Sequence, residues 1–475
     1  MATIIANEIK FGTDGWRGVI GDTFTFKNVG IVAQAIAEWI NQNTPSINGV
    51  KTVCVGYDNR FLSEEFAEAV SCVLAENEIK VYLSDTSLPT PALSFGVTKK
   101  KSVAGVMITA SHNPGKFNGI KIKTAQGGAA GRDITDVVEK FLYQTEVKKA
   151  DAVVAKRSGA IVIFDFKEDY VRFIRKYIDF KKIKNAKFKV IQDVMHGSGR
   201  DLMRQILKGT KVNLEIIRSD VNPSFEGGKP EPVTEYLTAL IGRMKKEKWD
   251  LGLVLDGDAD RIAAVAPGGH FISPQKILGL LILHLVRNRK VQGGVVKTLC
   301  GTTMINKIAA KLNLKLYETP VGFKYISDLM VTQKIVAGGE EAGGMGLPNY
   351  IPERDGSLAG LLLVEMMVYQ KKNIQQLLGE MEKEFGAYYY ERLDLTIGRH
   401  ACDLNKIKAI PGLLGKAVVS VKDFDGVKLT CEDESWLMFR PSGTEPLVRI
   451  YSEAKSLKTA KALIQFGRKF LEASL

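Results

Sequence analysis

A regular alternation of short β-rich runs with helical stretches constrains the fold of this chain more than any other feature. In the first repeat, apolar residues recur at helical spacing over residues 29–40 and 63–76. Strand-like runs lie between and after these stretches, at residues 53–55, 81–83 and 103–108. The alternation returns over residues 189–255 and over residues 295–337. Such alternation is typical of parallel βαβ units, so the sequence predicts three related α/β units.

The pattern changes after about residue 385. Alternating strand-like runs at 393–397, 427–430 and 436–439 precede a closing helical stretch at 457–471. With 475 residues, the chain also exceeds the roughly 250–300 residues at which one hydrophobic core stops growing. We therefore expect an α/β fold of three related domains with mixed or parallel βαβ sheets and a C-terminal α+β domain. The expected boundaries are 1–157, 158–270, 271–385 and 386–475.

The positive net charge of the chain suits several classes of anionic partner. A net charge of +13 suits nucleic acid, an anionic membrane or small phosphorylated ligands. The lysine runs at 99–101 and 181–184 lack interleaved aromatic residues, so they read as solvated surface rather than a nucleic-acid patch. The longest apolar stretch, 278–286, is far shorter than the ~20 residues that span a bilayer. Charge alone does not choose among these partners, although these two observations lead us to expect no nucleic acid and no membrane.

The five cysteines indicate the compartment. They are scattered without CxxC spacing, which argues against a metal knuckle or a disulfide framework. The first residues also lack a basic segment followed by an apolar core. A reducing cytoplasm is the expected location.

Unusual polar loops follow a predicted strand in each α/β unit. They contain Ser111 in the first unit, Asp256, Asp258 and Asp260 in the second, and Glu340 in the third. Ligands of open parallel sheets bind beyond the carboxyl ends of the strands. The three loops therefore predict one shared central cleft.

The three aspartates predict a metal site. In an extended chain, side chains at a spacing of two lie on one side, so Asp256, Asp258 and Asp260 are expected to converge. Adjacent carboxylates repel unless a cation lies among them, and a small all-oxygen set suits Mg²⁺. Arg261 and Pro267 stand where an EF-hand needs its glycine and glutamate, so that motif is excluded.

Ser111 begins a turn-rich loop that continues with His112, Asn113, Pro114 and Gly115. A serine hydroxyl needs a base or an electropositive setting to act as a nucleophile, and His112 and Lys121 are nearby candidates. No Ser-His-Asp triad is visible, so these residues alone leave an ordinary loop serine open.

Two further segments suggest ligand contacts. Residues 440–444, which read Arg-Pro-Ser-Gly-Thr, and Arg449 are typical of an anion cradle, although a solvated hairpin turn is the alternative. Glu340 and Glu341 lie between glycines. They suit acceptors of hydrogen bonds from sugar hydroxyls, and the alternative is that they are merely exposed acidic residues.

Taken together and in order, these segments resemble the motifs of the α-D-phosphohexomutases, the family of phosphoglucomutase and phosphomannomutase. The matching segments are residues 109–114, 256–261, 339–341 and 440–444. The resemblance implies four domains around a central cleft and a phosphoryl group carried on Ser111. It also implies Mg²⁺ held by Asp256, Asp258, Asp260 and the Ser111 phosphate, with a hexose 1,6-bisphosphate as intermediate and activator.

The resemblance also implies roles for single residues. Lys121 matches the general base, His112 assists it, and Arg17 and Arg261 support the phosphoserine. Glu340 matches the residue that grips sugar hydroxyls. The cradle for the non-transferring phosphate matches Arg440, Ser442, Gly443, Thr444 and Arg449.

The choice of sugar depends on the third unit. Residues 319–324, which end in Lys324 as a substrate contact, resemble the glucose-using branch. Ala342 and Gly344 stand where the family often has serine and histidine. We expect a hexose 1-phosphate/6-phosphate mutase that prefers glucose, with mannose or glucosamine phosphate as alternatives. A phosphatase or an inactive phosphosugar-binding protein is a more distant reading.

Overall fold

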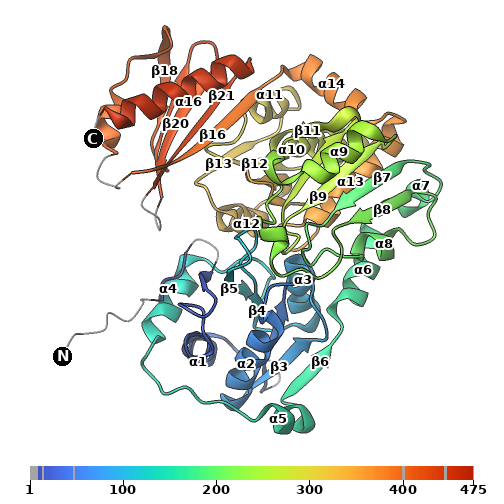
Figure 1. The fold of residues 1–475 in the computed structure, drawn as a ribbon, viewed down its shortest axis with the longest axis vertical. Helices are drawn as coiled ribbons and strands as arrows, with labels where there is room; N and C mark the ends of the chain where they lie inside the picture. The colour runs from blue at the N-terminus through green and yellow to red at the C-terminus, as the bar shows by residue number, and fades with distance from the viewer. Residues whose placement is uncertain (1–8, 13–14, 47–48, 398–401, 443–446, 474–475) are drawn as a thin grey trace.

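Four β-sheets follow one another along the chain (Figure 1). The structure is a computed structural model that describes residues 9–12, 15–46, 49–397, 402–442 and 447–473. In Figure 1 the N-terminal sheet lies at the bottom, the second and third units lie to the right and top, and the C-terminal unit lies at the upper left. The first and last units thus lie at opposite ends of this view.

The first sheet is mixed, in the order β1-β5-β4-β2-β3-β6. Its strands are β1 (Trp16–Val19), β2 (Lys51–Tyr57), β3 (Ile79–Ser84), β4 (Ala104–Ile108), β5 (Phe117–Thr124) and β6 (Ile161–Phe164). Its helices are α1 (Phe26–Asn43), α2 (Ser63–Glu76), α3 (Thr90–Lys100), α4 (Arg132–Phe141) and α5 (Ala152–Ser158). β6 lies beyond the expected boundary at residue 157 but pairs with β3, and Ile161 is buried in the same core as Val81. The first sheet therefore extends to Phe164.

The second sheet has the order β11-β10-β9-β7-β8. Its strands are β7 (Lys189–Asp193), β8 (Asn213–Ile217), β9 (Leu251–Leu255), β10 (Ile262–Ala266) and β11 (His270–Ile272). β7, β8 and β9 are parallel, whereas β10 and β11 are antiparallel additions. Its helices are α6 (Phe166–Tyr177), α7 (Phe180–Ile183), α8 (Leu202–Leu207) and α9 (Thr238–Lys246), with 3₁₀ turns η1 (Phe225–Gly227), η2 (Thr234–Tyr236) and η3 (Pro267–Gly269).

The third sheet has the order β13-β12-β14-β15, with one antiparallel edge formed by β15. Its strands are β12 (Gly294–Thr298), β13 (Leu316–Thr319), β14 (Ile335–Gly339) and β15 (Met345–Gly346). Its helical segments are α10 (Pro274–Leu283), the π-helical turn η4 (His284–Asn288), α11 (Thr303–Lys311), α12 (Phe323–Thr332), α13 (Gly356–Gln370) and α14 (Ile374–Phe385).

One continuous core joins the first three units. Helix α13 is apolar on all sides and buried from Gly356 to Met367, as expected of a helix packed inside a protein. It contacts α10 as well as β9 and β10 of the second sheet. Apolar residues of all three units, among them Leu93, Ile206 and Ile305, belong to this core. The three α/β units are therefore held together by shared hydrophobic burial.

The C-terminal unit has its own core. Its sheet has the order β16-β21-β20-β19-β18-β17, and all its strand pairs are antiparallel. The strands are β16 (Tyr389–Thr396), β17 (Gly412–Leu413), β18 (Lys416–Lys422), β19 (Val427–Cys431), β20 (Trp436–Pro441) and β21 (Leu447–Ala454), and the helices are α15 (Leu404–Lys408) and α16 (Leu457–Glu472). A small apolar cluster that includes Leu299 and Trp436 joins it to the third unit. The predicted fold of three α/β domains and a C-terminal α+β domain is confirmed.

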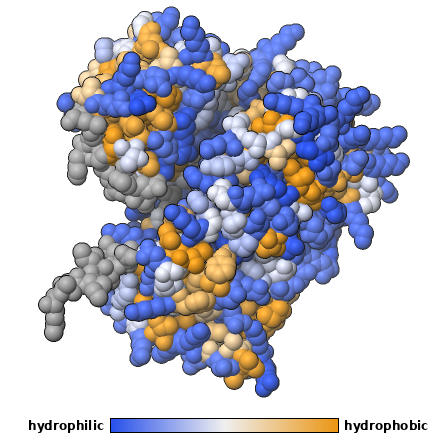
Figure 2. All heavy atoms as spheres, viewed as in Figure 1, coloured by the Kyte–Doolittle hydropathy of each residue, from blue (hydrophilic) through white to orange (hydrophobic). Residues whose placement is uncertain are grey.

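Figure 2 shows one face of the molecule, on which hydrophobic residues form several groups among hydrophilic ones. Among the described residues, no helix combines the length and apolar character needed to cross a bilayer.

Candidate active site

Ser111 lies just beyond the end of β4, in a loop of residues 109–117 that we call the serine loop. Its side chain is buried, and its backbone has a φ of +52°, in the left-handed region. The Ser111 N–H donates to Thr109 Oγ1 at 2.9 Å. This conformation aims the Ser111 hydroxyl at the second unit, where its Oγ donates to Asp256 Oδ2 at 2.9 Å.

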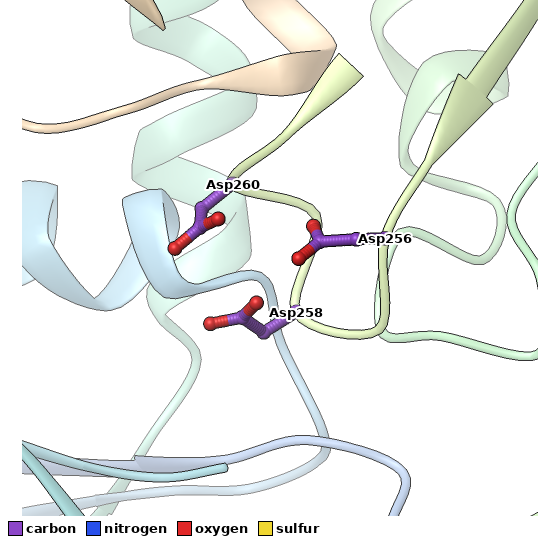
Figure 3. A group of neighbouring side chains, drawn as sticks. All are labelled: Asp256, Asp258 and Asp260. Carbon is purple, nitrogen blue, oxygen red and sulfur yellow. The ribbon is translucent and has the colours of Figure 1, made fainter. Parts of the chain in front are cut away.

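Asp256, Asp258 and Asp260 lie in the connection between β9 and β10, the aspartate loop of residues 256–260 (Figure 3). One carboxylate oxygen of each lies within 4.8 Å of the others, and the three carboxylates face a common space. Their convergence was predicted, but its stated cause was wrong. The loop is a turn in which Ala259 has a φ of +58°, so turning of the backbone, and not strand alternation, brings the carboxylates together.

The three carboxylates fit a divalent cation. All are fully buried, and Asp258 Oδ1 and Asp260 Oδ1 have no hydrogen-bond partner among the described residues. Burial, together with the charges of Asp260 and Asp258, raises the pKa of Asp256 well above its usual range. A cation among these oxygens would bind the unpartnered oxygen atoms and would offset the repulsion among the buried carboxylates. An oxygen-only set of this size suits Mg²⁺.

Lys121 on β5 reaches the same carboxylates. Its Nζ lies 2.8 Å from Asp258 Oδ2 and 3.0 Å from Asp260 Oδ2. Thr90 Oγ1 also donates to Asp258 Oδ2, at 2.5 Å. Burial acts to raise the pKa of Asp258, but the Lys121 ammonium and the Thr90 hydrogen bond outweigh it and lower that pKa.

His112 within the serine loop, together with Arg17 and Arg261, lies close to Ser111 and the aspartate loop. His112 Nδ1 lies 3.4 Å from Ser111 Oγ. Burial and the neighbouring charges of Arg261 and Arg17 hold the pKa of His112 well below its usual range, so the ring is neutral at neutral pH. Arg17 Nη1 donates to Asn113 Oδ1 at 2.6 Å, and the Arg261 N–H donates to Asp256 Oδ1 at 3.0 Å.

A cleft of about 680 Å³ opens beside this centre and is lined by residues of all four units. Nine lysine and arginine residues and four acidic residues are among the described residues that line it. They include the predicted substrate contacts Lys324, Glu340, Arg440 and Arg449. The excess of positive charge suits an anionic ligand.

In the C-terminal unit, Arg440 on β20 and Arg449 on β21 are cross-strand partners that line the cleft. Arg440 Nε donates to Asp425 Oδ1 at 2.9 Å, and Arg449 Nε lies 3.6 Å from Asp394 Oδ2. The buried Ser442 follows β20, and its N–H donates to the Leu447 carbonyl at 2.9 Å. The predicted cradle residues Gly443 and Thr444 lie outside the described residues.

Arg354 contacts both the aspartate loop and Glu340 of the third unit. Arg354 Nη2 lies 2.8 Å from Asp260 Oδ2, and Nη1 lies 3.5 Å from Glu340 Oε2. A Cβ at Gly344 would lie 2.3 Å from Arg354 Cδ. The absence of a side chain at Gly344 therefore makes room for Arg354.

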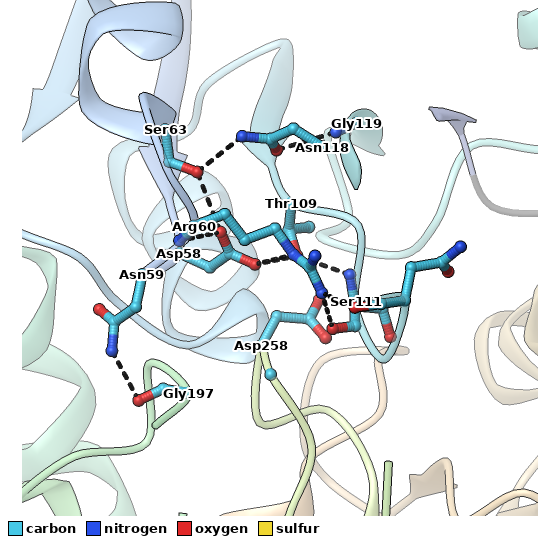
Figure 4. A network of polar contacts seen from close by, with 12 residues as sticks. Asp58, Asn59, Arg60, Ser63, Thr109, Ser111, Asn118, Gly119, Gly197 and Asp258 are labelled. Atoms are coloured by element: carbon cyan, nitrogen blue, oxygen red, sulfur yellow. Dashed lines mark hydrogen bonds and ion pairs between the residues drawn. The ribbon is translucent and has the colours of Figure 1, made fainter. Parts of the chain in front are cut away.

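Sequence reasoning missed several polar residues at this centre. Arg392 lines the cleft and binds Asp394 through Nε at 2.7 Å and Nη2 at 2.6 Å. Arg60 contacts the serine loop from beneath (Figure 4). Arg60 lies just past the end of β2, so the strand-end rule that singled out Ser111 could have found it. Arg354 and Arg392 carry no comparable local signal.

Comparisons with known proteins agree with this site. Four models of the phosphoglucomutase/phosphomannomutase family match in chain order: alpha/beta/alpha domain I at residues 8–148, domain II at 168–269, domain III at 273–385 and the C-terminal domain at 401–466. The chain thus belongs to the phosphoglucomutase/phosphomannomutase, or α-D-phosphohexomutase, family, and it is an intramolecular phosphotransferase.

Individual relatives cover nearly the whole chain. A crystal structure of a Thermus thermophilus protein assigned as a phosphomannomutase is 32% identical, with a TM-score of 0.87, over 98% of this chain and 99% of that one. A Methanosphaera stadtmanae protein assigned as a phosphoglucosamine mutase is 29% identical over 97% of this chain and 98% of its own length. A Thermococcus kodakarensis phosphoglucomutase/phosphomannomutase is 27% identical over 98% and 99%. The names of these relatives cover three different sugars.

Proposed function

We propose that this chain is a magnesium-dependent phosphohexomutase that interconverts a hexose 1-phosphate and the hexose 6-phosphate, with glucose as the preferred sugar. The observation that carries the proposal is the 2.9 Å contact between Ser111 Oγ and Asp256 Oδ2, beside a basic cleft. A hydroxyl held against a carboxylate cluster that fits a cation is placed to carry a phosphoryl group.

The proposed reaction consists of two transfers through Ser111. A free sugar hydroxyl attacks the phosphorus of phospho-Ser111, and the bond between phosphorus and Ser111 Oγ breaks. Lys121 takes the proton of the attacking hydroxyl and passes it to Ser111 Oγ, which leaves as the hydroxyl. The product is a hexose 1,6-bisphosphate, which turns in the cleft and returns its other phosphoryl group to Ser111. Bound at Asp256, Asp258, Asp260 and the Ser111 phosphate, Mg²⁺ would neutralise charge on the group in transfer.

The other site residues bind and orient the substrate in this proposal. Arg17 and Arg261 stabilise the phosphorylated Ser111 through their positive charge, and His112 assists as a neutral hydrogen-bonding group beside it. Glu340 and Lys324 contact the sugar. The non-transferring phosphate binds at Arg440, Ser442, Gly443, Thr444 and Arg449. We keep the expected four-domain division at residues 157, 270 and 385, but move the first boundary past β6. Each domain then contributes one group of the proposed site residues.

Glucosamine phosphate is the second candidate substrate. Glu340 and Glu341 both line the cleft, and the negative charge of two carboxylates attracts a 2-ammonium group. One of the relatives is assigned as a phosphoglucosamine mutase. Mannose phosphate follows from the phosphomannomutase assignment of the Thermus thermophilus relative.

The test is a side-by-side rate measurement on glucose, mannose and glucosamine 1-phosphates with Mg²⁺ and a trace of the matching bisphosphate. We expect isomerisation without release of inorganic phosphate, fastest on glucose, and none in Ser111→Ala. Ser158→Ala, which alters an exposed serine of α5, is the matched control and should keep wild-type rates. Phosphate release in proportion to substrate consumed would instead identify a phosphatase. Wild-type rates equal to those of Ser111→Ala on all three sugars would overturn the proposal.

A further inference from the structure

The guanidinium of Arg60 is buried beneath the serine loop, and all five of its N–H donors are used. Four of them reach main-chain carbonyl oxygens of the serine loop: those of Ser111 (2.6 Å), Asn113 (2.7 Å), Pro114 (3.0 Å) and Phe117 (3.0 Å). The fifth, Nε, donates to Asp58 Oδ2 at 3.2 Å. Figure 4 shows this network, in which the Asp58 carboxylate also accepts from Thr109.

The serine loop needs such a partner. A left-handed φ at a residue other than glycine costs about 1–2 kcal/mol, and Ser111 adopts one. Carbonyl groups that are turned inward must be paired when they are buried. A lysine at position 60 would keep the charge but would lack the planar fork and two of the five donors. Arg60 is therefore fitted to this loop by its shape as well as its charge.

Asn59, the neighbour of Arg60, is bonded to the second unit. Its Nδ2 donates to the carbonyls of His196 at 2.9 Å and Gly197 at 2.8 Å. The next residue, Ser198, donates its N–H to the carbonyl of Gly257 in the aspartate loop at 2.9 Å. Asn59 thus reaches the aspartate loop through a single short turn.

The backbones of the two loops also touch. A Cβ at Gly257 would lie 2.4 Å from the Ser111 carbonyl oxygen, and a Cβ at Gly197 would lie 2.7 Å from the Gly257 carbonyl oxygen. Only glycine permits this approach. Small displacements of either loop would therefore change the position of Ser111 Oγ relative to the carboxylates.

From these contacts we infer that Asn59 and Arg60 are positioning residues that hold the serine loop and the aspartate loop in register for phosphoryl transfer. The inference rests on the proposed function. Arg60 fixes the carbonyls, and hence the turn, that aim Ser111, while Asn59 fixes the turn that supports Gly257. Neither side chain touches the reacting atoms.

The first test is Arg60→Lys, which keeps the charge and removes the fork. We expect kcat at saturating Mg²⁺ to fall about 100-fold, because small misplacements of reacting groups cost this much. KM for the hexose phosphate should change less than about twofold, since the phosphate cradle lies in another domain. Amide exchange should become faster at residues 111–117 and stay unchanged elsewhere. Arg172→Lys, at an exposed position of α6, is the matched control for all three measurements.

Asn59→Ala is the second variant and keeps the inference testable if Arg60→Lys does not fold. We expect the Mg²⁺ concentration for half-maximal activity to rise about 10-fold, as is usual when an outer partner of a metal site is lost. Unchanged kcat and exchange in Arg60→Lys, or unchanged Mg²⁺ dependence in Asn59→Ala, would overturn the inference. So would faster exchange throughout the Arg60→Lys chain, because it would indicate a general loss of stability.

The amide-exchange measurement separates this inference from the proposed function. If the wild-type protein isomerises none of the three sugar phosphates, the proposed function fails. Faster exchange confined to residues 111–117 would then still support the role of Arg60 in holding the loop, and its absence would reject that role.

Discussion

The carboxylate centre of the first two domains and the arginine cluster of the C-terminal domain, formed by Arg392, Arg440 and Arg449, differ in how they are held. Ser111 and Lys121 are 1% exposed and the three aspartates are fully buried. The side chains of Arg440, Arg449 and Arg392 are 16%, 24% and 35% exposed. The groups proposed to react are thus buried, whereas the groups proposed to grip the distant phosphate are partly exposed and lie on a separate sheet.

This difference has a chemical meaning. Phosphoryl transfer requires in-line geometry within a fraction of an ångström, which close packing provides. A cradle that must accept either phosphate of a bisphosphate needs charge and hydrogen-bond donors more than a single fixed geometry. Changes in the buried centre should therefore lower kcat, and changes in the arginine cluster should raise KM.

The largest expected effect is in the buried centre. Asp258→Asn removes the charge of one predicted metal ligand, which is also one of the two carboxylate partners of Lys121, without changing the size of the side chain. We expect kcat to fall about 1,000-fold or more, because electrostatic stabilisation of the transferring group is lost. Steady-state rates with Mg²⁺ measure this. Chelation of the metal should abolish wild-type activity, and added Mg²⁺ should restore it. Asp201→Asn, at an exposed residue, is the control, and near-wild-type activity of Asp258→Asn would contradict the site.

The next effect concerns the core that carries the buried centre. Glu365 of α13 is buried and accepts hydrogen bonds from Arg289 Nε and Nη2 at 2.6 Å each and from His284 Nε2 at 2.9 Å. Glu365→Gln leaves Arg289 without a carboxylate partner, so we expect the free energy of unfolding to fall by about 3 kcal/mol. Chemical denaturation measures this. An unchanged midpoint would show that these contacts do not support the core.

The same residue gives a pH dependence. Burial acts to raise the pKa of Glu365, but the hydrogen bonds from His284 and Arg289 outweigh it and lower that pKa to about 2. The unfolded chain has the ordinary value of 4.5. The stabilisation is therefore present above pH 4.5 and is lost as pH falls from 4.5 towards 2. Denaturation curves between these pH values should show this loss in the wild type and a flatter dependence in Glu365→Gln.

A smaller effect is expected in the arginine cluster. Arg440→Ala should raise KM for the hexose phosphate about 10- to 100-fold with little change in kcat, because a charge-assisted hydrogen bond contributes about 1.5–3 kcal/mol. Arg468→Ala, at a half-exposed arginine of α16 in the same domain, should leave both constants unchanged. A fall in kcat with constant KM would place Arg440 with the reacting groups. It would contradict the proposed difference between the buried centre and the arginine cluster.

The smallest effect is expected at Asp425. It accepts hydrogen bonds from Arg440 Nε at 2.9 Å and from the Val321 N–H at 2.6 Å, so it links the arginine cluster to the third domain. Asp425→Ala should raise KM about 3- to 10-fold, as expected for the loss of a net hydrogen bond of about 0.5–1.5 kcal/mol. Asp423→Ala, two residues away and exposed, is the control. A larger rise in KM than that of Arg440→Ala would mean that Asp425 positions more than this arginine.

Much of the fold follows from local pattern. The helical stretch expected at residues 63–76 is α2 with the same bounds, and the strand-like run expected at 103–108 is β4, Ala104–Ile108. The run expected at 53–55 belongs to the longer β2, Lys51–Tyr57, and the run expected at 393–397 belongs to β16, which begins earlier, at Tyr389. The hydrophobic pattern did not predict strand β18. Most residues of Lys416–Lys422 are exposed, so the segment lacks the alternation of a half-buried strand.

The candidate site could be predicted in part. The serine and aspartate loops carry unusual residues at strand ends, and the structure brings Ser111, Lys121 and the three aspartates together. Their roles stay predictions until the variants are measured. Arg60 lies just past the end of β2, where the strand-end rule could have found it, whereas Arg354 carries no such signal. The partners of both arginines lie in segments far along the chain or across a domain boundary. No local window of sequence contains such contacts.

By itself, the sequence determined the periodicity of the elements, the order of the polar loops and the kinds of chemistry that their side chains can perform. These depend on bonded neighbours and on side-chain type, which the chain specifies residue by residue. Only the tertiary structure decided which groups meet: Ser111 and Asp256 are 145 residues apart in sequence, yet their side chains are 2.9 Å apart. Packing around a shared core makes that contact, and Arg60, Gly197 and Gly257 allow the loops to approach closely enough.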